Sequence, residues 1–237
     1  MATSILAAAL AGTVGLLLMV HVSRRKSLRA EFIRSYSFPI GLFEKVRKKH
    51  PHLTLKDCQL VSRALRQFFL THLKSGCKFV SMPSQVTDDL WHEFILYTKH
   101  YDAFCKQAFG RFMHHSPAVV LGSIKESNAG LRRCWWYACQ EENIDPKKPL
   151  RLPLLFAIDN KLDIKGGFRY ATDCRGVSSA QYKNADSGNA VMYCGGDFSS
   201  PSIDGSTDGF GDSLFGDSGV SGDSGGGGCG GGCGGGD

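Results

Sequence analysis

The pattern of apolar and polar positions divides the chain into an uncharged start, a helical middle and a glycine-rich end. Between Ile5 and Val22 almost every residue is apolar, and no charged residue precedes Arg24. At about 1.5 Å of rise per residue, an uncharged helix of this length is able to cross a hydrocarbon layer about 30 Å thick. The pattern therefore predicts a single-pass transmembrane anchor over residues 1–23, followed by a basic juxtamembrane linker over residues 24–37.

The first segment lacks the features of a cleavable secretory signal. Such a signal has a basic start and a small-x-small cleavage site, whereas residues 1–4 are uncharged and residues 19–23 contain no such site. A cleaved signal and an apolar helix of a soluble protein are the alternatives. Because Lys and Arg follow the segment and none precedes it, we expect an inner (cytoplasmic) membrane protein with its N-terminus outside and its bulk in the cytoplasm. Its basic residues suit an anionic lipid surface.

Helical spacing of apolar residues continues through the middle of the chain. Thr54 and Asp57 have the spacing of a capping box at a helix start, and Gly76 and Gly110 are typical of helix ends. Strand signals are sparse. The sequence therefore predicts a mainly α protein with a compact domain over residues 38–175. Its expected helices cover residues 39–50, 55–75, 85–109, 119–142 and 152–161.

The end of the chain has a different composition. Residues 176–237 are rich in Gly, Ser, Asp and Cys, and a Gly-Asp-Ser triplet recurs three times. Glycine-rich chain loses much backbone entropy on ordering and has little to bury, so we expect this tail to be disordered.

The net charge of +6 is the sum of two opposite parts. Residues from 177 onward hold eight Asp and one Lys and carry about −7, and the rest of the chain carries +13. A basic body with an acidic tail favours a membrane and an unidentified protein as partners. No nucleic acid is expected, because no recognition motif accompanies the charge.

The nine cysteines are odd in number and scattered, which argues against a disulfide framework. In a reducing compartment they stay thiols. Cys58, Cys134 and Cys139 fall in helical patterns and are expected to be small buried residues. Cys229 and Cys233 have a spacing that permits soft-metal binding or a modification, although two free thiols in a disordered tail is the simpler expectation.

A distinctive string follows Ser84. It begins with Trp91-His92-Glu93-Phe94, continues through residues 101–105 and ends with Phe109-Gly110-Arg111-Phe112 and His114-His115. Together with residues 82–89, 152–157 and 166–170, it resembles the bacterial branch of the glycine-rich domain-containing protein-like family, over about residues 38–175. Plant members of the wider family often have a second His where this chain has Phe94. The resemblance implies a fold and a domain, and no reaction.

Histidine, cysteine and carboxylate residues gather in and after the predicted helix at residues 85–109. They are the ligands that zinc prefers, so zinc is a candidate cofactor. In a continuous helix His92 and Cys105 lie about 20 Å apart, and four residues after Gly110 do not reach back to His92. The residues therefore allow two separate metal sites. One pairs His92 with Asp88, and the other pairs Cys105 with His114 or His115. The alternative to the first is a His92 that is only hydrogen-bonded, and the alternative to the second is a partly exposed loop pair of His114 and His115.

No catalytic motif is recognisable, so the sequence favours a protein that is not an enzyme. The first functional hypothesis is a membrane-anchored helical interaction or scaffold module with a flexible acidic tail. The second is a metal-binding protein or metalloenzyme that uses either of the two sites. Trp91 is expected to be buried in the core.

Overall fold

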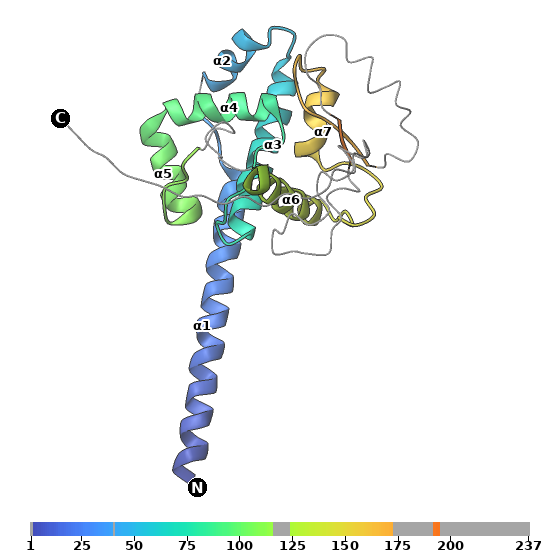
Figure 1. Cartoon of the computed structure of the whole chain (residues 1–237). Coiled ribbons are helices and arrows are strands. Elements are labelled where there is room, and N and C mark those ends of the chain that lie inside the picture. Colours follow the sequence, from blue (N-terminus) through green and yellow to red (C-terminus); the bar gives the residue numbers. More distant parts are fainter. Residues whose placement is uncertain (1, 40, 116–123, 173–191, 195–237) are drawn as a thin grey trace, which may run out of the picture.

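The computed structural model describes residues 2–39, 41–115, 124–172 and 192–194. For residues 2–9, 124–128 and 192–194 it describes the backbone alone. The described residues form a helical domain with a projecting helix and a small two-stranded sheet (Figure 1). The mainly α prediction is therefore confirmed. The elements are α1 (Ala2–Ser35), α2 (Leu42–Lys49), α3 (Leu55–Lys74), α4 (Gln85–Leu96), α5 (Thr98–Phe109), α6 (Ile124–Glu141), α7 (Leu154–Lys161), β1 (Arg169–Ala171) and β2 (Met192–Cys194).

Helix α1 is a continuous helix that leaves the domain as a stalk (Figure 1). Side chains from Leu10 to Leu28 are exposed, whereas Ala30 and Ile33 near its other end are buried in the core. The basic residues after Val22 were expected to form a linker. They continue the helix instead, because Arg and Lys are good helix formers.

The described part of the chain contains no helix that is both long and apolar enough to cross a membrane. The predicted single-pass transmembrane anchor is therefore not supported.

Helix α3 is the central element of the domain, and α1, α4, α6 and α7 pack around it (Figure 1). Its start is the predicted capping box: Thr54 Oγ1 accepts from the N–H of Asp57 at 3.2 Å, and the Asp57 carboxylate accepts from the N–H of Thr54 at 2.8 Å. Most of α3 is buried, including Phe68 and Phe69. These rings form the centre of an aromatic core to which α1, α4 and α5 also contribute.

The expected helix at residues 85–109 is two helices in the structure. Helix α4 ends at Leu96, α5 starts at Thr98, and Tyr97 between them has φ −82° and ψ 59°, outside the helical region. The two helices run in clearly different directions (Figure 1). This break brings the chain after α5 back toward α4.

Strands β1 and β2 pair in parallel, with Tyr170 opposite Tyr193. Neither strand was expected from the sequence, and β2 lies within the segment predicted to be disordered. The rest of that segment, with Cys229 and Cys233, lies outside the described residues. Cys58, Cys134 and Cys139 are buried, as expected, and are free thiols.

Candidate metal centre

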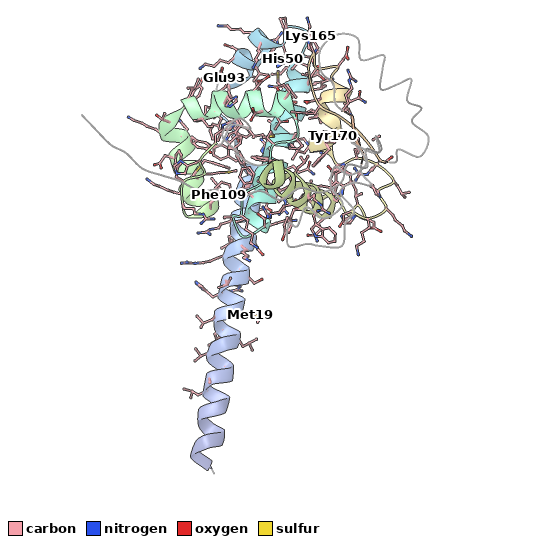
Figure 2. All side chains as sticks on the ribbon, viewed as in Figure 1. Met19, His50, Glu93, Phe109, Lys165 and Tyr170 are labelled. Carbon is pink, nitrogen blue, oxygen red and sulfur yellow. The ribbon has the colours of Figure 1, made fainter. Side chains whose placement is uncertain are left out.

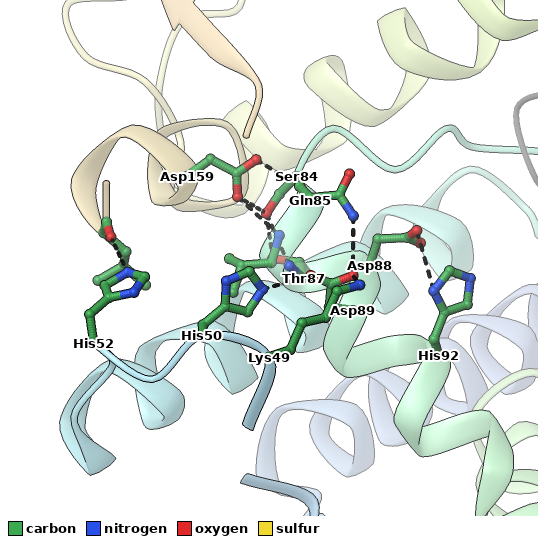
Figure 3. A network of polar contacts seen from close by, with 12 residues as sticks. Lys49, His50, His52, Ser84, Gln85, Thr87, Asp88, Asp89, His92 and Asp159 are labelled. Atoms are coloured by element: carbon green, nitrogen blue, oxygen red, sulfur yellow. Dashed lines mark hydrogen bonds and ion pairs between the residues drawn. The ribbon is translucent and has the colours of Figure 1, made fainter. Parts of the chain in front are cut away.

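The start of α4 is fixed by a buried carboxylate from α7. Asp159 accepts hydrogen bonds from Ser84 Oγ at 2.7 Å and from the N–H of Phe168 at 2.9 Å. It also accepts from the N–H groups of Gln85 at 2.7 Å and Val86 at 3.2 Å. The first N–H groups of a helix have no partner within it and carry the positive end of its dipole, so a carboxylate there is stabilising. Asp159 thereby positions the polar residues of the next turns of α4 (Figure 3).

Asp88 and His92 lie one turn apart on α4, and His115 reaches the same place from the segment after α5. Nε2 of His115 is 3.1 Å from Oδ1 of Asp88, and Nδ1 of His92 is 3.6 Å from Oδ2 of Asp88. The two imidazole centroids are 4.3 Å apart. One ligand atom from each residue lies within 4.8 Å of those of the other two. The structure thus gathers two imidazoles and one carboxylate, here called the Asp88–His92–His115 cluster.

The cluster has a buried side and an open side. The side chains of His115 and Asp88 are 15% and 23% exposed, whereas that of His92 is 49% exposed. Figure 3 shows Asp88 and His92 side by side on α4. The inner two groups are therefore held by their surroundings, while His92 has room to turn and the open side is accessible to solvent.

A chain of contacts holds His115 in place. Its ring packs against Trp91 with centroids 4.6 Å apart. Trp91 Nε1 donates to Tyr101 Oη at 3.2 Å, and Tyr101 Oη donates to the carbonyl oxygen of Met113 at 2.6 Å. Trp91, Tyr101 and Met113 are all buried. The segment that carries His115 is therefore tied to both α4 and α5.

The sequence argument separated His115 from His92 because it assumed one helix through residues 86–109. That assumption is wrong, since the break at Tyr97 turns α5 away from the axis of α4. The pair of Asp88 and His92 expected from the sequence is present as neighbours, and His115 joins it. Metal binding by these residues stays a prediction.

Among the described residues, no group of three possible metal ligands includes Cys105 or His114, so the second predicted site, Cys105 with His114 or His115, stays a prediction. Cys105 is fully buried, its thiol lies beside Tyr101 and the backbone of Met113, and burial raises its pKa. His114 is exposed and contacts Phe112 with ring centroids 4.9 Å apart. His115 contacts Asp88 instead. A buried thiol with a raised pKa is a poor source of the thiolate that binds metals.

A neighbouring polar network surrounds Asp89, and no local sequence pattern predicts it. Asp89 is buried, and its Oδ2 lies 2.7 Å from Nε2 of His50, which is also buried. Lys49 and Gln85 contact Oδ1 of the same carboxylate (Figure 3). The network joins the end of α2 to α4.

The donor set of the cluster matches the preferences of borderline divalent metals. Imidazole nitrogen and carboxylate oxygen bind zinc at about 2.0–2.2 Å, and three protein ligands leave a coordination position open. Ligand atoms around such an ion lie about 3–3.5 Å apart, so the cluster would have to tighten from its 4.8 Å limit, and the half-exposed His92 ring is the ligand with most room to move. With one carboxylate, the cluster lacks the several oxygen ligands that calcium requires.

Comparisons with known proteins give a family. Residues 28–198 match the UCP032817-like family, which is well over half of the chain. The chain belongs to the UCP032817-like family. The predicted membership of the glycine-rich domain-containing protein-like family is therefore wrong, although the stretch that carried that resemblance lies within the matched residues. No curated protein and no solved structure matches this chain. The matched region begins at Leu28, just before the buried part of α1, and includes the whole cluster.

Proposed function

We propose that this protein binds one divalent transition metal ion, with zinc as the expected ion, through Asp88, His92 and His115. The observation that carries the proposal is the convergence of three suitable ligand atoms within 4.8 Å from two separate segments. The geometry also provides support around the ligands: Asp159 fixes the start of α4, and Trp91 packs against His115. Preorganised ligands bind metal more tightly because less ordering accompanies binding.

An open coordination position on the solvent side permits either of two roles. A zinc ion held by Asp88, His92 and His115 would lower the pKa of a water ligand and supply hydrolytic chemistry, or it would accept a ligand from another molecule. The described residues around the cluster supply no nucleophile and no oxyanion donor of the kind that would define a reaction. The proposal is therefore metal binding, without a substrate.

The test is cobalt and zinc titration of the purified full chain after chelator treatment and dialysis. We expect one ion per chain, with a cobalt spectrum that lacks the sulfur-to-metal charge-transfer band, because no thiolate belongs to the cluster. Asp88→Asn and His115→Gln are each expected to weaken binding at least tenfold, since even supporting residues of metal sites contribute that much.

His114→Gln is the matched control, because this exposed neighbour of His115 lies outside the cluster. It is expected to leave the affinity unchanged. Binding by His115→Gln as tight as that of the natural chain would refute the proposal, as would a strong sulfur band, which would assign the metal to cysteines.

A second function, attachment to a lipid bilayer, has its own supporting observation. The described apolar side chains of α1 are exposed around the whole helix, with Leu17 at 68% and Met19 at 71%. An apolar helix surface of this kind is unfavourable in water, and the uncharged sequence from Ile5 onward extends it. The anionic cytoplasmic leaflet attracts the cluster of basic residues that follows, so the folded domain is proposed to lie on that side. The protein partner predicted from the sequence stays a prediction.

Sedimentation of the full chain with vesicles of neutral phosphatidylcholine tests the attachment. We expect the natural chain to sediment with the vesicles and Leu17→Asp to remain in the supernatant, because a charge in the apolar stretch opposes burial in lipid. Ser27→Asp, beyond the apolar stretch on the same helix, is the control and is expected to sediment. A natural chain that stays in the supernatant would remove the attachment proposal.

A further inference from the structure

The face of the domain from which α1 leaves, here called the basal surface, collects residues from four parts of the chain. The guanidinium of Arg29 on α1 lies so close to Gly110, the C-cap of α5, that a Cβ at Gly110 would be 2.6 Å from its Nη2. The lower end of α5 and the end of α3 meet α1 here (Figure 1). The basal surface comprises Arg29, Lys78, Phe79, Arg111, Phe112 and Arg133.

Hydrogen bonds join these segments into one surface. Arg111 donates to the carbonyl oxygen of Cys77, and Arg133 on α6 donates to that of Phe79. A Cβ at Gly130 would lie 2.6 Å from Cε1 of Phe79, so the ring of Phe79 lies directly against α6. The loop after α3 is thus held between the end of α5 and the helix α6.

The basic groups of the basal surface keep their charge uncompensated. Arg29, Lys78, Arg111 and Arg133 form no ion pair with another described residue, and a carbonyl partner leaves the guanidinium charge in place. Three other cations of the domain are paired: Arg34 and Lys74 contact Glu141, and Lys106 contacts Asp102. The residues that make up the basal surface therefore carry a net positive charge.

Two exposed aromatic rings accompany this charge. Phe79 is 37% exposed and Phe112 is 43% exposed, although both are large apolar side chains. Apolar rings beside cations suit a lipid headgroup layer, where the ring contacts the upper acyl chains and the cation contacts phosphate.

The position of the basal surface along α1 fits that layer. Arg24, Arg25 and Lys26 directly follow the apolar stretch, and Arg29 begins the basal surface. From Arg24 to Arg29 the helix advances about 7.5 Å, which is close to the thickness of one headgroup region. If the apolar stretch lies in lipid, the basal surface lies at the headgroups.

We propose that the basal surface binds the anionic headgroups of a phospholipid bilayer and presses the domain onto the membrane. This inference rests on the proposed attachment of α1. Insertion of the apolar stretch of α1 needs no particular lipid charge. Binding by the basal surface requires negative lipid and depends on Lys78, Arg111 and Arg133, which lie outside α1.

The test compares sedimentation of the full chain with vesicles of phosphatidylcholine alone and of phosphatidylcholine mixed with phosphatidylglycerol. The natural chain is expected to partition more strongly into the mixed vesicles. The double variant Lys78→Gln/Arg111→Gln is expected to lose at least tenfold of that partitioning, since each basic residue at an anionic surface contributes about a fivefold factor. Its partitioning into neutral vesicles is expected to stay unchanged.

The matched control is Lys161→Gln/Lys165→Gln, which removes two charges from exposed lysines of α7 and the following turn. Lys165 lies at the end of the domain opposite the stalk (Figure 2). This control is expected to bind mixed vesicles like the natural chain. Arg111→Lys keeps the charge while removing the guanidinium, so it is expected to retain most of the binding and to separate charge from loop structure.

Each outcome decides between the proposals. The proposal for the basal surface is overturned if the double variant and the control lose partitioning into mixed vesicles equally, or if neither loses any. Binding to neutral vesicles without any gain from negative lipid also overturns it while leaving the attachment of α1 standing. Failure to bind either vesicle removes both. Thermal unfolding shows whether the double variant is folded. If it is not, the partitioning of Lys78→Gln alone into mixed vesicles tests the proposal.

Discussion

Tyr101 donates a hydrogen bond to the carbonyl oxygen of Met113 at 2.6 Å, and this bond ties α5 to the segment that ends in His115. The same hydroxyl oxygen accepts from Trp91 Nε1. Burial raises the pKa of Tyr101, so the phenol stays protonated and keeps its donor. A buried tyrosine on one helix thereby sets the position of a candidate metal ligand.

Removal of that hydroxyl is expected to loosen the cluster without touching a ligand. Tyr101→Phe leaves the Met113 carbonyl and the Trp91 N–H without their partner, which should lower the free energy of unfolding by about 1–3 kcal/mol. We also expect weaker zinc binding, because His115 is then less ordered. Urea unfolding and zinc titration measure the two effects. Tyr137→Phe, on a half-buried tyrosine of α6, is the control, and an unchanged zinc affinity in Tyr101→Phe would contradict the positioning role.

Asp159→Ala is expected to destabilise the domain strongly. The carboxylate is 2% exposed and accepts from three backbone N–H groups and one hydroxyl, all of which lose their partner together. The expected loss in the free energy of unfolding is about 3 kcal/mol or more. The nearby Asp163→Asn is the comparison: its side chain is 94% exposed, and asparagine tolerates its φ of 46°. A change there above about 0.5 kcal/mol would be unexpected.

His72 is expected to make the folded domain sensitive to acid. Burial lowers its pKa from 6.5 to about 4, so the unfolded chain binds more protons between those pH values. The contribution of neutral His72 to the free energy of unfolding is therefore complete above about pH 6.5. As the pH falls to about 4, the free energy of unfolding drops by about 3 kcal/mol. Urea unfolding across this range measures it. The curve for His72→Gln should be flatter than that of the natural chain, and parallel curves would contradict the assignment.

Trp91 is 4% exposed, which confirms the burial expected from its helical position. Its ring contacts Phe68, Phe69 and His115. Trp91→Ala is expected to lower the free energy of unfolding by about 3–5 kcal/mol, because a large cavity opens in the core. Trp136→Ala, on a tryptophan that is only half-buried, should cost clearly less in the same denaturant titration. Equal losses in the free energy of unfolding for the two variants would contradict a core role for Trp91.

Local signals in the sequence were sufficient for most of the helices. The capping box at Thr54 and the glycine at residue 110 mark helix ends in the structure, because caps depend on neighbouring residues alone. The break at Tyr97 carries no Gly or Pro. It is produced by packing, which places Phe94 and Tyr101 in contact across it at 5.3 Å between centroids.

The same reason limited the prediction of the site. Asp88 and His92 are related by helical spacing, so their proximity followed from sequence. The approach of His115 depends on the turn at Tyr97 and on the bond from Tyr101 to Met113, which are tertiary facts. The carboxylate of Asp159 reaches α4 from α7 and likewise has no local sequence signal.

Helix α1 has one further consequence as an uninterrupted rod that runs from solvent into the core. It contains no proline and no break between its exposed half and the buried Ala30 and Ile33. A rod without a joint transmits rotation, so the domain cannot swivel independently of the segment outside it. The packing of Ile33 in the core therefore fixes how the domain is rotated about the axis of α1. Insertion of one residue directly after Leu28 would rotate the folded domain by about 100° about the axis of α1, relative to the exposed half of the helix.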